Sequence, residues 1–167
     1  MASLNKKTKH IVDVYVKYFG RVATVDEIRS FDDVKTLSKI TAEVRVNAAN
    51  ESGLKGSDYL NSIIQNLFGR SEANAFESKY AKKLDDNVYY NLPIATIIKK
   101  GSKDDKGVYN AKKLVAEMVV EKGGSYELAN INQDNYLSIY SAKKGLLVTT
   151  IAELEAKIVN VEGNING

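Results

Sequence analysis

A short segment ending in Phe-Gly-Arg occurs twice in this chain. One copy ends at Arg21 and the other at Arg70, so their glycines, Gly20 and Gly69, lie 49 residues apart. Each copy closes a stretch whose apolar residues recur at helical spacing, and glycine is the residue that commonly follows a helix C-terminus. A repeat of this kind is typical of a supersecondary unit present in two copies.

The similarity extends upstream of the glycines along the apolar face. The matched pairs, first copy before second, are Ile11 and Leu60, Val14 and Ile63, Tyr15 and Ile64, Tyr18 and Leu67, and Phe19 and Phe68. We therefore expect Phe19 and Phe68 to be buried in equivalent places. We also expect Arg21 and Arg70 to hydrogen-bond the carbonyls left without partners at the ends of their helices.

The remaining pattern predicts a succession of short helices. The predicted helices run over about 24–31, 34–48, 58–68, 71–83, 114–122 and 150–159, with capping boxes at 24–27 and 150–153 and a cap at Ser71. Residues 101–107 are interpreted as a charged surface loop. Residues 146–151 carry the one competing β signal, that of a short strand. The predicted fold class is all-α: a multi-helix domain of short helices with an internal two-copy repeat at about 10–35 and 58–84.

The length of 167 residues suits one domain with a sizeable core. Residues 1–9 are expected to be a flexible N-terminus. Residues 10–160 form the predicted single helical domain, divided into a repeat half (10–84) and a second half (85–160). Residues 161–167, rich in Asn and Gly, are typical of a linker-like tail.

Composition excludes several classes of function. The net charge of +3 is too small to indicate nucleic-acid binding, and no apolar run approaches the ~18 residues of a membrane span. The chain has no cysteine, which excludes disulfides and thiol chemistry. The phosphate-loop and dinucleotide fingerprints are missing, so no cofactor is expected.

Neither a metal site nor an enzyme is expected. Adjacent carboxylates occur at 32–33, 85–86 and 104–105, but none follows the Asp-x-Asp-x-Asp-Gly spacing of a calcium loop. The single histidine, His10, has no nucleophile or acid at motif spacing, so we interpret it as a solvated surface residue.

Tyrosines and lysines coincide in the second half of the chain. A tyrosine ring offers an apolar face with a polar tip, which suits stacking on sugars. A lysine can form charge-assisted hydrogen bonds with phosphate or an acidic sugar. The candidate glycan-binding residues are Tyr89, Tyr90, Lys99, Lys100, Lys103, Tyr136 and Tyr140.

The segment from Tyr15 to Arg21 resembles a repeated helical unit with the signature Tyr-x3-hydrophobic-Gly-Arg. Such units occur near the N-termini of bacterial surface-layer proteins and of type I secreted calcium-repeat proteins. The second copy, ending at Arg70, matches with Ile64 in place of Tyr. The resemblance covers about residues 10–84, without the Gly and Trp that usually follow the Arg. The structural repeat residues are Tyr15, Phe19, Gly20, Arg21, Phe68, Gly69 and Arg70.

This resemblance implies an N-terminal cell-surface anchoring domain of a surface-layer protein, which binds lipopolysaccharide non-covalently. The implied location is secreted, at the outer face of a Gram-negative bacterium. The implied partners are lipopolysaccharide or another surface glycan, and further copies of the chain in a lattice. The alternative is a helical protein–protein docking or lattice-assembly module without glycan binding. A third reading, a glycan hydrolase, is the least favoured because it needs two carboxylates at a fixed separation.

Overall fold

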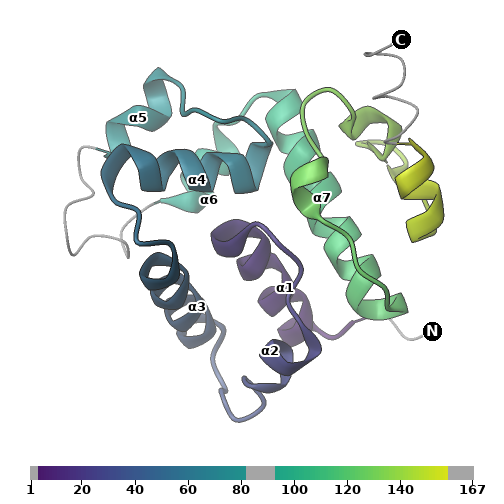
Figure 1. Cartoon of the computed structure of the whole chain (residues 1–167), viewed down its shortest axis with the longest axis horizontal. Helices are drawn as coiled ribbons and strands as arrows, with labels where there is room; N and C mark the ends of the chain where they lie inside the picture. The colour runs from purple at the N-terminus through teal and green to yellow at the C-terminus, as the bar shows by residue number, and fades with distance from the viewer. Residues whose placement is uncertain (1–3, 82–92, 158–167) are drawn as a thin grey trace.

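The computed structural model describes residues 4–81 and 93–157 and is mostly helical, which confirms the predicted all-α class (Figure 1). The helices are α1 (Lys6–Phe19), α2 (Val25–Arg29), α3 (Leu37–Ser52), α4 (Gly56–Phe68), α5 (Ala75–Ala81), α6 (Ile94–Lys99) and α7 (Lys103–Lys122). Two 3-10 turns, η2 (Leu128–Asn130) and η3 (Tyr136–Ser138), precede a two-residue hairpin of β1 (Tyr140–Ser141) and β2 (Gly145–Leu146). A last helical segment covers 151–157.

Helix α1 lies in the middle of the molecule and is buried on two sides (Figure 1). One side faces a core built mainly with α3 and α4, and the other faces a core built with α7 and the chain after it. The α1 residues in the first core are Ile11, Val14, Tyr15 and Tyr18. Those in the second are Val12 and Val16. The apolar face predicted for this helix was therefore too narrow, because Val12 and Val16 are also completely buried.

Both repeated glycines follow a helix C-terminus, as predicted. Gly20 has φ 68° after α1, and Gly69 has φ 67° after α4, a left-handed conformation that favours glycine. The Gly20 amide donates to the carbonyls of Tyr15 and Val16, at 3.0 and 3.1 Å. Gly69 is further constrained by a close approach, because a Cβ there would lie 2.9 Å from the Cα of Asn132.

The prediction that the two arginines cap these helix ends was wrong. Amide and ammonium groups from other elements do so instead. Asn66 Nδ2 donates to the carbonyl of Lys17 at 3.0 Å, at the end of α1. At the end of α4, Lys112 Nζ donates to the carbonyl of Gln65 at 2.9 Å, and Gln133 Nε2 donates to that of Phe68 at 2.7 Å.

In the first copy, Arg21 connects the end of α1 to α2. Arg21 forms a bidentate pair with Glu27, at 2.7 and 2.8 Å. The same carboxylate accepts from the Thr24 amide and completes the predicted capping box of α2. The Arg21 guanidinium beside Glu27 lowers the pKa of that carboxyl to about 2, with burial opposing the shift and Thr24 adding to it.

The second copy repeats this arrangement before α5. Arg70 pairs with both oxygens of Glu77, at 3.1 and 2.9 Å. Glu77 accepts from the Asn74 amide, and its own amide donates to the Asn74 side chain. Asn74 therefore caps α5, and the cap predicted at Ser71 was wrong. Both copies thus share a left-handed glycine, an arginine and the capping carboxylate of the next helix.

Arg70 also bonds a second carboxylate, which Arg21 does not. Its Nε and Nη2 each lie 3.0 Å from an oxygen of Asp105 at the start of α7. Gln133 Nε2 donates to the same carboxylate at 3.0 Å. Burial raises the pKa of Asp105, but the hydrogen bonds from Arg70, the Ser102 amide and Gln133, with the charge of Arg70, outweigh it and the net shift is downward.

The charged loop predicted at 101–107 is the first turns of α7. Ser102 and Asp105 form a capping box there, each accepting from the backbone amide of the other. Position 107 lies within α7 and requires glycine, because the Tyr136 ring packs directly against its backbone. A Cβ at Gly107 would lie 2.2 Å from Cε2 of that ring.

Other boundaries also differ from the prediction. The supposedly flexible N-terminus becomes helical at Lys6, where the Asn5 side chain caps α1. The strand predicted at 146–151 is confined to Gly145–Leu146. Thr150 accepts from the Glu153 amide as expected, but the Glu153 carboxylate bonds Thr149 instead of closing the box on Thr150. The predicted tail at 161–167 lies outside the described residues.

Phe19 and Phe68 are not equivalently buried, contrary to the prediction. Phe68 is completely buried in the first core, whereas Phe19 only packs at its edge. The Phe19 ring stacks on the Tyr15 ring, with 5.0 Å between the two ring centroids. The Arg21 guanidinium lies 4.8 Å from the centroid of the Phe19 ring. Phe19 therefore closes the surface of the core, and Phe68 fills its interior.

Lys112 is 1% exposed, and its ammonium bonds only the Gln65 carbonyl among the described residues. Burial lowers the pKa of Lys112 to about 8, from 10.5. Between these values the unfolded chain binds more protons at this residue, so its contribution to stability rises with pH.

A Lys112→Met substitution is therefore expected to stabilise the fold at pH 7, by about 2 kcal/mol. The Gln65 carbonyl keeps its bond from the Gly69 amide, at 3.1 Å. The gain should shrink as the pH rises from about 8 to 10.5, where the unfolded chain loses the proton. Urea unfolding of both proteins across this range measures it, and a variant less stable at pH 7 would contradict the expectation.

Candidate functional site

Three hollows of the described surface have lining residues that bear on a function. The first, the tyrosine pocket, has a volume of about 410 Å³ and lies between α7 and the η3–β1 segment. Its lining residues are Lys103, Lys106, Gly107, Asn110, Tyr136, Leu137, Tyr140 and Ala142. Helical spacing brings the α7 members onto one side of that helix, and the turn at η3 places the others opposite them.

The tyrosine pocket contains three of the predicted glycan-binding residues. Lys103, Tyr136 and Tyr140 come from different elements and line it together. Lys99 and Lys100, at the end of α6, are exposed and are not among the lining residues. The remaining two candidates, Tyr89 and Tyr90, lie outside the described residues.

Tyr136 supports the tyrosine pocket more than it offers a free surface. Its ring is buried against Gly107, and its hydroxyl donates to Asp104. That hydrogen bond, with burial, raises the pKa of Tyr136 to about 12. The accessible apolar surface comes instead from the half-buried Tyr140 and from Leu137, which is 66% exposed.

Sequence reasoning missed five of the residues that line the tyrosine pocket: Lys106, Gly107, Asn110, Leu137 and Ala142. Lys106 and Asn110 follow Lys103 at helical spacing, so they share its face of α7. The signal was present in the sequence but was hidden because 101–107 was interpreted as a loop. Leu137 carried no signal, since a single leucine in a weakly patterned segment does not reveal its exposure.

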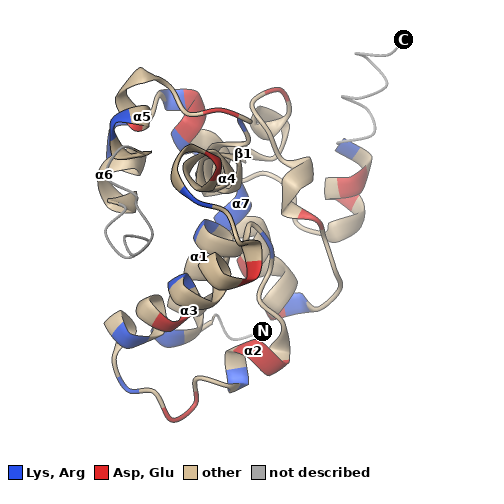
Figure 2. Ribbon diagram, turned by 60° about the vertical axis from the view of Figure 1, so that its left-hand side comes forward, with Lys and Arg blue, Asp and Glu red and all other residues tan. Residues whose placement is uncertain are grey.

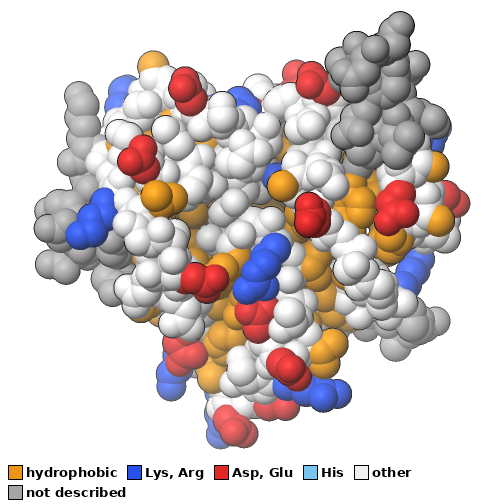
Figure 3. Space-filling model, viewed as in Figure 1, with side chains coloured by type: hydrophobic (Ala, Val, Ile, Leu, Met, Phe, Trp, Pro, Cys, Tyr) orange, Lys and Arg blue, Asp and Glu red, His pale blue; other side chains and the backbone are white. Residues whose placement is uncertain are grey.

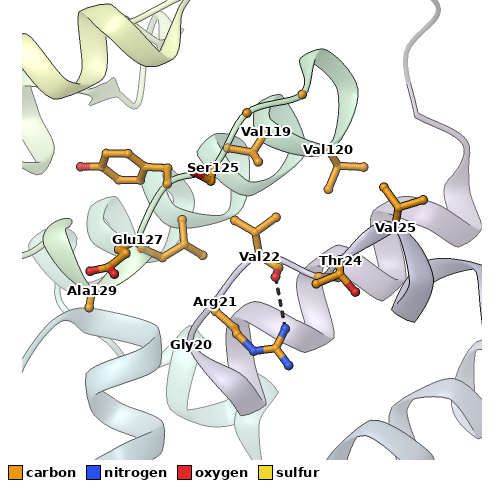
Figure 4. Close-up of a pocket in the computed structure, with 15 residues that line it drawn as sticks. Gly20, Arg21, Val22, Thr24, Val25, Val119, Val120, Ser125, Glu127 and Ala129 are labelled. Atoms are coloured by element: carbon orange, nitrogen blue, oxygen red, sulfur yellow. Dashed lines mark hydrogen bonds between the residues drawn. The ribbon is translucent and has the colours of Figure 1, made fainter.

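The second hollow, the furrow, has a volume of about 670 Å³ and runs between the α1–α2 connection and the end of α7 (Figure 4). Val22 and Val25 approach from one side, and Val119 and Val120 from the other. Hydrophobic side chains reach the surface over this part of the molecule (Figure 3). Arg21 lies at one end, where Nη1 donates to the Val22 carbonyl at 3.3 Å. The furrow is therefore mainly apolar.

The third hollow, the lysine pocket, has a volume of about 420 Å³ and lies between α1 and α7 beside the start of α3. Its lining residues are Lys6, Lys9, His10, Asp13, Leu37, Lys113, Leu114 and Glu117. The expectation that His10 is a solvated surface residue was wrong. Its ring is partly buried, and Nε2 lies 2.8 Å from Thr41 Oγ1 and 3.1 Å from the Leu37 carbonyl oxygen.

Lys and Arg are interspersed with Asp and Glu over the described ribbon (Figure 2). A charged ligand would therefore be attracted by the charges around one pocket more than by the electrostatic field of the whole molecule. Within residues 4–81 and 93–157, no group of three or more histidines and carboxylates could hold a metal ion. In the same ranges, no helix combines the length and the apolarity needed to cross a membrane.

No protein-family model matches this chain, and no curated protein or solved structure does so either.

Proposed function

We propose that this domain is a non-enzymatic anchor that binds lipopolysaccharide glycan in the tyrosine pocket and holds a surface-layer protein on the outer face of a Gram-negative bacterium. The observation that carries the proposal is the convergence of Lys103 and Tyr140 on one pocket. The resemblance of the Phe-Gly-Arg segments to surface-layer repeats supplies the biological setting.

The chemistry of the tyrosine pocket suits a sugar that carries negative charge. Tyr140 and Leu137 present apolar surface on which a sugar ring can pack. Lys103 and Lys106 are both exposed, so their ammonium groups can reach a phosphate or carboxylate on the ring. Asn110, one turn further along α7, offers both a donor and an acceptor for sugar hydroxyls.

We expect a Lys103→Ser/Lys106→Ser variant to bind polysaccharide released from lipopolysaccharide about tenfold more weakly at low salt. Added salt should shrink this difference because it screens exposed charges. A Tyr140→Ala variant should lose affinity at both salt concentrations, since stacking does not depend on screening. Calorimetric titration of the whole chain with the polysaccharide measures both effects.

Lys143→Ser/Lys144→Ser is the matched control. It removes the same charge from two exposed lysines of the hairpin connection, outside the tyrosine pocket. Its affinity should stay within about twofold of the original, since isolated surface charges contribute little. A folded domain that binds neither lipopolysaccharide nor its polysaccharide would contradict the proposal.

The furrow favours the alternative, a protein–protein docking or lattice-assembly module. Its apolar lining includes Val25, which is 59% exposed. An apolar surface of this kind is typical of protein contacts. If no glycan binds, concentration-dependent association of the chain that a Val25→Lys substitution abolishes would support this alternative.

A further inference from the structure

We infer that the lysine pocket is a second subsite, which takes a phosphate group carried by the same glycan chain. This inference rests on the proposed function and adds to it the position of a charged substituent.

The lysine pocket gathers ammonium groups from two helices. Lys6 and Lys9 are one turn apart on α1, and Lys113 faces them from α7. Among the described residues, no ion pair joins any of the three to a carboxylate. Three ammonium groups around one hollow attract a multiply charged anion, and a phosphate has enough oxygens to accept from several of them.

Two carboxylates, Asp13 and Glu117, also line the lysine pocket. Their environments weaken the electrostatic repulsion that they would exert on a bound anion. Asp13 is engaged by Lys17 Nζ at 2.7 Å and by the Tyr109 hydroxyl. Burial raises the pKa of Glu117, with Lys113 and Lys9 opposing the shift and Asp13 and Glu121 adding to it.

The tyrosine pocket and the lysine pocket share one face of α7. Residues 103, 106, 110, 113 and 117 follow one another at intervals of three and four, so they form a continuous stripe. From 103 to 113 this stripe is about 15 Å long. A glycan chain packed against Tyr140 can therefore continue along α7 and bring a substituent to Lys113.

The test compares the polysaccharide before and after removal of its phosphate groups, with inorganic phosphate as a separate probe. A Lys9→Ser/Lys113→Ser variant should bind the phosphorylated polysaccharide about tenfold more weakly. It should bind the dephosphorylated one as the original protein does. Lys143→Ser/Lys144→Ser again serves as the control of equal charge.

The outcomes separate this inference from the proposed function. If the polysaccharide binds but Lys9→Ser/Lys113→Ser and dephosphorylation leave affinity unchanged, the subsite is overturned and the anchor stands. If the original protein binds no polysaccharide, the anchor and the glycan-borne phosphate both fail. If the original protein then binds inorganic phosphate saturably and Lys9→Ser/Lys113→Ser does not, free phosphate is the ligand of the lysine pocket. If the original protein does not bind inorganic phosphate either, the lysine pocket is not an anion site.

Discussion

Replacing Arg70 with methionine is expected to lower the free energy of unfolding by about 3–5 kcal/mol. The substitution removes the only charged partner that the described contacts give to Glu77 and Asp105, which are 1% and 5% exposed. Each would remain as a buried carboxylate without a countercharge. Urea unfolding at pH 7 measures the loss.

Arg21→Met is the matched control, since it removes an arginine from the equivalent place in the other copy. The Arg21 side chain is 42% exposed and pairs with one carboxylate instead of two. We expect a loss below about 1 kcal/mol, in the range of exposed ion pairs. Equal losses in the two variants would show that burial at Arg70 does not determine its contribution.

Phe68→Ala is expected to cost about 3–5 kcal/mol, because it empties a completely buried aromatic site at the end of α4. Phe19→Ala should cost about 1–2 kcal/mol, because its ring is only partly buried and the cavity would open to water. Thermal and urea unfolding of the two variants give the comparison. A Phe68→Ala loss below about 1 kcal/mol would mean that the core closes around the gap.

Local signals predicted helix ends well. Glycine after an apolar helical face located the ends of α1 and α4, and Thr24 with Glu27 located the start of α2. These features depend on residues close together in sequence, which is why pattern and capping chemistry reveal them. The burial difference between Phe19 and Phe68 depends on what packs from elsewhere, so matched sequence could not show it.

The start of α7 illustrates why the rest could not be predicted. Its capping box uses Asp105 in place of the usual Glu or Gln, within a charged stretch that contains two glycines. Gly107 is explained only by the Tyr136 ring, which lies far along the chain.

The candidate site could not be predicted in full for the same reason, because it depends on contacts between residues far apart in sequence. Residue type suggested Lys103 and Tyr140, but only the packing of α7 against the η3–β1 segment brings them together.

The position of α1 between two cores has a consequence for how the molecule opens. Val12 and Val16 belong to one core, while Ile11 and Val14 belong to the other, so neither core is complete without this helix. Releasing α1 would expose both cores to water at once. We therefore expect the two halves to unfold together as one cooperative unit. The backbone amides of α1 should exchange hydrogen with solvent only when the whole domain unfolds.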